Sequence, residues 1–215
     1  LGDVYKRQPS MSMVESFTHK KDRSLDSDVM NAHQKASLGT GNLMKYVEDY
    51  YRVNDDFDSV AGLSQIMQAE AIRFAVEAHR RNMPYCMGTL YWQFNDCWPV
   101  ISWSSIDYGG NWKALHYAAR KFFSPLLVSM RDLDNKIEIH VTNDQHYEIE
   151  SEIRLGLFNF NGDTLFNDSS DIKVEPFSSV IYRAFDKDDL LGGSDPSAIM
   201  FRVELFVDSK VISRA

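Results

Sequence analysis

The sequence predicts two successive folds: an α/β segment with the element order of a (β/α)8 TIM barrel, and then an immunoglobulin-like β-sandwich. The first prediction rests on a helix, a short apolar strand, a long polar loop and a second helix that follow one another before Pro125. The second rests on several short runs of alternating polar and apolar residues after Pro125. The change of pattern at Pro125 therefore marks the expected boundary between the two folds.

Helical spacing predicts two helices ahead of the apolar strand. Residues 9–41 show no clear period and are expected to form a loop with short helices. Apolar side chains then recur every three or four positions over residues 43–50. A longer helix is expected after an N-cap at Asp58 or Ser59, and Pro84 prevents its continuation. Its expected buried stripe is Val60, Leu63, Met67, Ala71, Phe74 and Ala78.

A short apolar run and one further amphipathic stretch complete the α/β segment. Residues 85–91 lie between Pro84 and a polar loop, which suits a buried parallel strand. A last helix is expected after that loop and before Pro125. The apolar face of this helix is Trp112, Leu115, Ala119 and Phe122. A strand, a long loop and a helix in this order are typical of a βα-barrel, in which the chemistry lies on the loops after the strands.

Alternating runs and two turn signals predict the sandwich. About six or seven short strands are expected over residues 125–215. The clearest runs are residues 136–141, 152–157, 171–174, 179–185 and 199–207. Asn161-Gly162 is a strong two-residue hairpin signal, and Asp208-Ser209-Lys210 is expected to form another turn.

The composition argues against several classes of function. A net charge of −8 argues against a nucleic-acid partner, because phosphate binding depends on clustered Lys and Arg. No apolar run approaches the roughly 20 residues that a membrane span needs, so no membrane partner is expected. Cys86 and Cys97 form no disulfide framework and lack other metal ligands, so neither a metal nor another cofactor is expected. The compartment stays open between cytoplasmic, periplasmic and extracellular.

The tryptophans are confined to one stretch of the chain. All four of them, Trp92, Trp98, Trp103 and Trp112, lie within residues 92–112. Such clustering is common in sites that stack flat ligands or the faces of sugars, and it is uncommon in a core. The stretch is thus either a sugar platform or a small aromatic core under a loop.

The first eight residues are expected not to be native protein. From Asp3 onward, residues 1–8 resemble the translated end of a transposon adapter used in sequencing libraries. Such scars are excluded from reasoning about the fold. Native sequence is expected to begin near Pro9, with an unknown length of chain missing before it. The alternative is a natural basic N-terminal arm.

A long motif around the tryptophans resembles a known enzyme family. Residues 87–108, MGTLYWQFNDCWPVISWSSIDY, closely resemble the last barrel strand and following loop of the β-mannosidases of glycoside hydrolase family two. Residues 111–117 continue the match into the last helix. Residues 30–35 and 77–82 look like the same subfamily.

The resemblance covers residues 9–130 and is weaker beyond them. It implies that residues 9–124 are the C-terminal part of a catalytic TIM barrel. It also implies that residues 125–215 are the sandwich that follows such a barrel in this family.

The resemblance further implies a retaining glycosidase mechanism. One glutamate protonates the leaving oxygen, and a second attacks the anomeric carbon, with the two carboxyl groups about 5–5.5 Å apart. In the family, the acid follows an Asn on an earlier strand, and the nucleophile lies in a Ser-Glu-Phe/Tyr-Gly motif shortly before the position of Pro9. No nucleophile motif occurs in this chain and the acid's strand is expected to precede it, so both glutamates are expected to be absent and the chain to be inactive alone. The parent enzyme is expected to remove terminal β-D-mannose from oligosaccharides or glycans.

Four residues after the expected strand are implied to bind the substrate, a β-mannoside oligosaccharide. They are Trp92, Asn95, Asp96 and Trp98. The family uses a tryptophan at the position of Trp92 as the floor of the subsite for the nonreducing mannose, and packing at the barrel top is the alternative. Asn95 and Asp96 either bond to sugar hydroxyls or hold the loop through side-chain-to-backbone bonds. Trp98 either walls the leaving-group side or packs within the loop.

Nearby residues give fewer expectations. His33 and Lys35 fall in the loop after the missing nucleophile, where they are candidates for sugar contact. Trp103 and Trp112 are expected to pack.

Two further functions stay open on the sequence. A related family-two enzyme acting on a β-glucosaminide or a β-galactoside would have the same fold, although the long tryptophan motif argues against it. The sandwich is alternatively a noncatalytic carbohydrate-binding or structural module, and its lack of tryptophan favours a structural spacer. No feature of the sequence indicates an oligomeric state.

Overall fold

The computed structural model describes residues 9–35, 39–54 and 56–215. The adapter-like residues 1–8 lie outside the described residues. The chain divides into two compact units. The first holds the described residues as far as Ala75 together with Thr89–Arg120, and the second holds Val76–Gly88 together with Lys121–Ala215.

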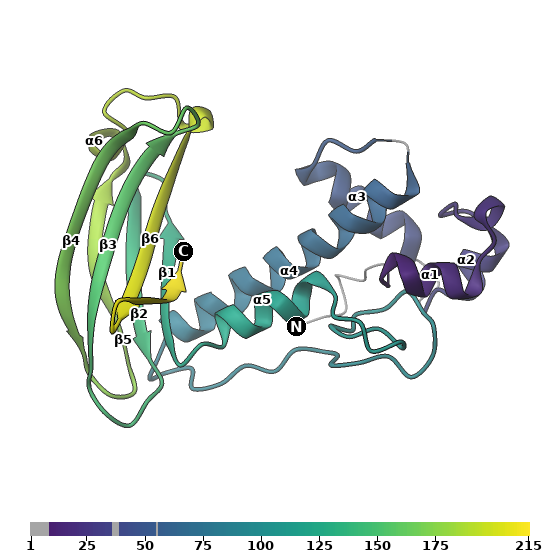
Figure 1. The fold of residues 1–215 in the computed structure, drawn as a ribbon, viewed down its shortest axis with the longest axis horizontal. Coiled ribbons are helices and arrows are strands. Elements are labelled where there is room, and N and C mark those ends of the chain that lie inside the picture. Colours follow the sequence, from purple (N-terminus) through teal and green to yellow (C-terminus); the bar gives the residue numbers. More distant parts are fainter. Residues whose placement is uncertain (1–8, 36–38, 55) are drawn as a thin grey trace. The chain divides into compact units, whose positions relative to one another are not determined.

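All the named secondary-structure elements described in the first unit are helices. These elements are α1 (Met11–Phe17), η1 (Lys20–Asp22), α2 (Asp28–Ala32), α3 (Gly39–Tyr50), most of α4 (Phe57–Arg81) and most of α5 (Ala114–Phe122). They are coloured from purple to teal in Figure 1. Two of the short helices begin at serine N-caps. The Ser10 hydroxyl accepts from the backbone N–H of Met13 at 3.2 Å, and Ser27 does the same for Met30.

The long helix α4 confirms the expected helix but not its cap. The backbone N–H of Ser59 donates to the Asp56 carboxylate at 2.8 Å. The cap therefore lies at Asp56 rather than at Asp58 or Ser59, because only a side chain ahead of the first turn reaches its free N–H groups.

The buried stripe of α4 also differs in its second half. Val60 and Met67 are buried as expected, whereas Phe74 is 70% exposed. Ile72 and Val76 are buried in its place. The buried residues Val60, Ser64, Gln68, Ile72 and Val76 recur every four positions, so the buried face turns gradually away from a stripe that follows the period of about 3.6 residues per turn.

The expected buried strand at residues 85–91 is not formed, which corrects the barrel prediction for this chain. Residues 86–91 have no regular secondary structure. Tyr85 and Leu90 are each 91% exposed. A parallel strand needs hydrogen-bonded neighbours at its edges, and no described strand lies beside this segment. The first unit has the predicted helices and loop without a barrel sheet.

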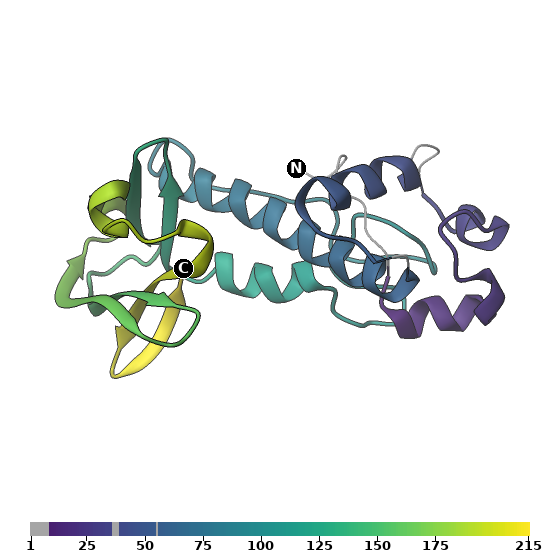
Figure 2. The same ribbon diagram turned by 90° about the horizontal axis from the view of Figure 1, so that it is seen from above.

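The second unit is a two-layered β-sandwich, as the sequence predicts, and Figures 1 and 2 show it from two directions. Its described strands are β1 (Leu126–Asp132), β2 (Lys136–Asn143), β3 (Ile149–Asn159), β4 (Thr164–Val174), β5 (Ser178–Asp186), β6 (Ile199–Val207) and β7 (Lys210–Arg214). One antiparallel sheet has the order β1-β2-β5, and the other has the order β4-β3-β6-β7. The short helices α6 (Lys187–Leu191) and η2 (Pro196–Ala198) lie between β5 and β6.

The core of the sandwich comes from both sheets. The buried cluster is Leu126, Val128, Ile139, Val141, Ile153, Leu155, Val174, Val203 and Leu205. Along their strands these residues recur at every second position and so share one face of each sheet, which explains why the period of the sequence predicts most of them.

The hairpin signal at Asn161-Gly162 is confirmed by the turn between β3 and β4. Gly162 has a φ of +94°, which favours glycine. The Asn159 side chain accepts from the backbone N–H groups of Asn161 at 3.0 Å and Asp163 at 2.9 Å.

Candidate functional site

The tryptophan-rich stretch is an exposed loop with paired backbone at its base. We define residues 92–112 as the tryptophan loop. Its outgoing arm, residues 93–96, runs beside and parallel to its returning arm, residues 103–106. The bonds that join the arms are Ser105 N to Gln93 O at 3.0 Å, Ile106 N to Phe94 O at 2.9 Å and Asp96 N to Ile106 O at 3.1 Å. These bonds give the loop the backbone pairing of a short ribbon.

A buried ion pair lies at the base of the loop. Nζ of Lys113 is 3.3 Å from Oδ2 of Asp96, and both side chains are fully buried. The same ammonium donates to the Ser104 hydroxyl at 2.7 Å. The Asp96 carboxylate also accepts from Ser102 at 2.6 Å and from Ser104 at 2.5 Å.

These contacts bear on the charge and the role of each partner. Burial lowers the pKa of the Lys113 ammonium, and the nearby Asp96 carboxylate opposes that shift. Both oxygens of Asp96 accept from groups of the protein. This geometry favours the loop-holding role of Asp96 over direct contact with a sugar.

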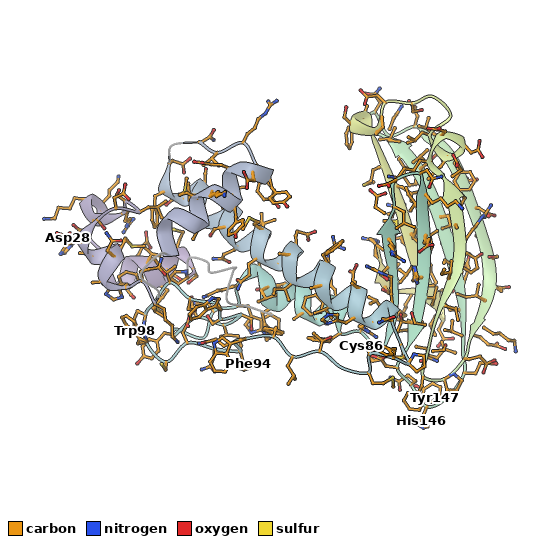
Figure 3. All side chains as sticks on the ribbon, turned by 180° about the vertical axis from the view of Figure 1, so that it is seen from behind. Asp28, Cys86, Phe94, Trp98, His146 and Tyr147 are labelled. Carbon is orange, nitrogen blue, oxygen red and sulfur yellow. The ribbon has the colours of Figure 1, made fainter. Side chains whose placement is uncertain are left out.

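Two aromatic rings of the loop face solvent. Trp92 is 63% exposed and Phe94 is 61% exposed, and Figure 3 shows Phe94 on the loop that follows α4. Gln93 lies between them and donates through its amide to the backbone carbonyl of Asn95 at 2.8 Å. Nζ of Lys35 lies 3.4 Å from the amide oxygen of Gln93. Flat apolar faces beside amide and ammonium groups suit a ligand with both apolar and hydroxyl-bearing faces.

Trp98 is placed by a stack of rings. The His33 ring lies 3.9 Å from the ring of Phe17, with their planes at 10°, and 5.4 Å from the ring of Trp98. Nδ1 of His33 donates to the backbone carbonyl of Pro99 at 2.6 Å. Trp98 is 37% exposed, and it is labelled in Figure 3. The stack thus joins α1, the turn after α2 and the tryptophan loop.

The other expected residues lie on or near the same loop. Asn95 is exposed, and its amide donates to the backbone carbonyl of Asp96 at 3.3 Å. Trp112 is 43% exposed and packs edge-on against His116 at 4.4 Å. Trp103 is half-buried, and its carbonyl accepts from Gln68 at 2.9 Å. The structure thus gathers the expected residues on one loop and exposes Trp92, Asn95 and Trp98.

A second buried carboxylate, Asp107, ties Ser10 to the loop. Asp107 is 2% exposed, and it accepts from the backbone N–H of Ser10 at 3.3 Å, from the Ser10 hydroxyl and from the backbone N–H of Asn111 at 2.9 Å. Burial by itself raises the pKa of the Asp107 carboxyl, but the hydrogen bonds from Ser10 and Asn111 outweigh it and hold that pKa below its usual value. Sequence reasoning missed Asp107 and Lys113, and the one signal for them was a charged residue next to apolar and aromatic neighbours.

Among the described residues, no group of three or more His, Cys, Asp or Glu side chains could hold a metal ion. No described helix is long and apolar enough to cross a membrane.

The sandwich carries a hollow of about 720 Å³ on its surface. Charged side chains line much of it, among them Glu150, Glu152, Asp171 and Lys173, and Phe206 is the aromatic ring of its lining. A lining of this kind differs from the aromatic platform that a sugar-binding module presents.

Comparisons with known proteins agree with the motif. Residues 135–215 match the family model described as a mannosidase Ig/CBM-like domain. The β-mannosidase of Capra hircus is 35% identical over 144 residues, which is 60% of this chain and 16% of the goat protein. The β-mannosidase of Mus musculus is 29% identical over 170 residues, which is 73% of this chain and 19% of the mouse protein. The chain thus spans less than a fifth of the length of these relatives.

Solved structures give the same result. The crystal structure of β-D-mannosidase from Dictyoglomus thermophilum matches with a TM-score of 0.92 at 28% identity, covering 100% of this chain and 26% of that protein. The exo-chitosanase of Amycolatopsis orientalis matches with a TM-score of 0.74 at 17% identity, covering 98% of this chain and 26% of that protein, and this likeness shows the fold alone.

Proposed function

Since this chain is related to the β-mannosidases of glycoside hydrolase family two, we propose that it is part of a retaining exo-β-mannosidase that removes terminal β-D-mannose from oligosaccharides or glycans. One observation carries the proposal. Trp92 stays 63% exposed at the start of a loop that rests on a buried ion pair. Leaving so large an apolar ring in water costs free energy unless a ligand covers it, and the C–H face of a pyranose is a suitable cover.

The exposed residues of the loop take the sugar-binding roles. Trp92 is the floor under the nonreducing mannose, and Trp98, supported by the His33 ring, walls the leaving-group side. The exposed amide of Asn95 bonds to sugar hydroxyls. Asp96 acts through the loop that it holds.

The parent protein supplies the rest of the catalytic domain. Residues 85–91 form the last strand of its TIM barrel, residues 9–124 are the end of that barrel, and residues 125–215 are a structural sandwich. The exposed apolar side chains of Tyr85 and Leu90 support this arrangement, because a strand buried on both faces reads as a continuous apolar run.

The chemistry needs two carboxyl groups that this chain does not provide. A nucleophilic glutamate attacks the anomeric carbon, and an acid glutamate protonates the leaving oxygen. In a retaining enzyme these two carboxyl groups lie about 5–5.5 Å apart. In this reaction the tryptophan loop orients the mannose while the covalent bond to the nucleophile forms and breaks. The chain alone is therefore inactive.

Turnover of 4-nitrophenyl β-D-mannopyranoside tests the proposal in two preparations: the 215-residue chain, and a longer protein in which its natural upstream sequence precedes Pro9. We expect hydrolysis by the longer protein only. Turnover by the 215-residue chain would show that the catalytic groups lie within it. Faster hydrolysis of the β-galactoside or β-glucosaminide by the longer protein would replace the proposed sugar.

The role of Trp92 is tested in the longer protein. Trp92→Ala is expected to lower kcat/KM about tenfold or more, because it removes the aromatic floor under the mannose. A tenfold loss corresponds to about 1.4 kcal/mol of lost transition-state binding. Trp112→Phe is the matched control, since a phenyl ring keeps the packing against His116. Equal losses in the two variants would remove the special role of Trp92.

A further inference from the structure

We propose that the buried ion pair between Lys113 and Asp96 is a positioning device that fixes the orientation of Trp92 and Trp98. Neither charged side chain is exposed, so both act through the loop rather than by touching a ligand. The proposal deepens the proposed function and rests on it only for the identity of the ligand that the two rings receive.

Stability alone is a weak reason for such a pair. Taking two charges out of water costs free energy that their attraction offsets only with good geometry, and apolar residues of similar volume often stabilise a core as well. The hydrogen bonds of an ammonium and a carboxylate are directional, whereas apolar contacts are not. Each such bond therefore fixes where its partner lies. The pair is therefore suited to selecting one arrangement of the loop.

The Asp96 carboxylate joins three parts of the chain at one point. Asp96 itself belongs to the outgoing arm of the tryptophan loop. Its partner Ser104 lies in the returning arm, Ser102 lies directly before that arm, and Lys113 immediately precedes α5. The ammonium also bonds to Ser104, so the three segments close a small network. A shift of this carboxylate would move the outgoing arm against both other segments.

The two rings lie on either side of this anchor in the chain. Trp92 precedes Asp96, and Trp98 follows it. The outgoing arm has a further contact with a charged group, Lys35 to Gln93 at 3.4 Å, but that contact is exposed. The His33 ring supports Trp98. The ion pair, in contrast, is buried, and it acts on the segment that carries both rings.

The tryptophan bands of the near-ultraviolet circular dichroism spectrum test the proposal on the 215-residue chain without any sugar. All four tryptophans lie in the tryptophan loop, so these bands report that loop alone. Lys113→Met leaves the Asp96 carboxylate buried without its cation. We expect most of the band intensity to be lost, while the far-ultraviolet signal and the cooperative thermal transition of the sandwich are kept.

Arg81→Met is the matched control. Arg81 also forms a buried ion pair, with Glu77 at 3.7 Å, but that pair lies within α4 and outside the loop. The tryptophan bands of the Arg81→Met variant are expected to stay unchanged. Unchanged bands in Lys113→Met, or an equal loss in Arg81→Met, would overturn the proposal.

A second variant covers the case in which Lys113→Met does not fold. Asp96→Asn keeps the shape of the side chain and an acceptor oxygen but removes the negative charge, and the same two outcomes apply to it. Because no sugar enters the experiment, its failure leaves the proposed function standing. Failure of the longer protein to hydrolyse the mannoside would likewise leave the positioning role standing.

Discussion

Nη2 of Arg80 lies 2.7 Å from Oδ2 of Asp144, and Nη1 of the same guanidinium donates to the backbone carbonyl of Phe122 at 2.5 Å. The Arg80 side chain is 8% exposed and that of Asp144 is 40% exposed. One side chain therefore ties the end of α4 to the end of α5 and to the loop after β2, all within the second unit. A buried guanidinium that donates to both a carboxylate and a backbone carbonyl contributes more to stability than an exposed ion pair does.

Loss of this guanidinium is expected to destabilise the second unit. Arg80→Met removes the donor of the Phe122 carbonyl and should lower the free energy of unfolding by about 1–3 kcal/mol. Urea unfolding followed by far-ultraviolet circular dichroism measures the change. Arg73→Met is the control, because it removes an exposed pair with Glu70 and should change the free energy by about 0.5 kcal/mol or less. Equal effects of the two variants would contradict this account.

Asp107 is expected to make the first unit sensitive to acid. A carboxyl whose folded pKa lies below its unfolded pKa of about 3.9 stabilises the fold fully above that pH. The stabilisation is then lost as the pH falls through the lower folded pKa. Because the Asp107 pKa is lowered, Asp107→Asn should reduce stability at neutral pH, and the difference from the unchanged chain should shrink below about pH 4. Urea unfolding between about pH 3 and pH 7, followed by tryptophan fluorescence, checks this, and a difference that is constant over that range would rule it out.

Two glycine-to-alanine changes are expected to have opposite signs. Gly162 has a φ of +94° in the turn between β3 and β4, so Gly162→Ala should cost about 1–2 kcal/mol of stability. Gly62 lies in α4, and a Cβ placed there meets nothing within 4 Å. Gly62→Ala should stabilise the helix by about 1 kcal/mol through helix propensity. Thermal unfolding of both variants gives the signs, and a shift in the same direction would show that local backbone preference does not decide them.

The fold was predictable from sequence where a single face of an element is buried. The sequence of β2 and part of β3 alternates polar and apolar residues, and the burial of β4 alternates along most of its length, so the period of two identifies these strands. Strand β1 was missed because Leu126–Ser129 is buried on both faces, which removes the alternation. The strand expected at residues 85–91 is not formed in this chain for a related reason. Their apolar run indicates burial, but burial of a strand depends on neighbours that the described chain does not contain.

The site was predictable in its residue types but not in its contacts. Clustering of tryptophan located the loop, and the side chains of Trp92 and Trp98 are exposed on it. The pairing of Asp96 with Lys113 was not predicted, because it joins the outgoing arm of the loop to the residue before α5, and these two segments meet only after folding. Sequence patterns report local period and composition, whereas a buried ion pair depends on distant chain segments.

The sandwich is expected to fold without the first part of the chain. Its buried core comes entirely from residues between 126 and 215, so residues 125–215 expressed alone should show a cooperative thermal transition. Residues 9–124 expressed alone should aggregate, because the apolar side chains of Tyr85, Met87 and Leu90 are exposed along one extended stretch. Circular dichroism melting and size-exclusion chromatography of the two pieces measure both outcomes. A monomeric, cooperatively melting preparation of residues 9–124 would show that this stretch needs no cover from the rest of a barrel.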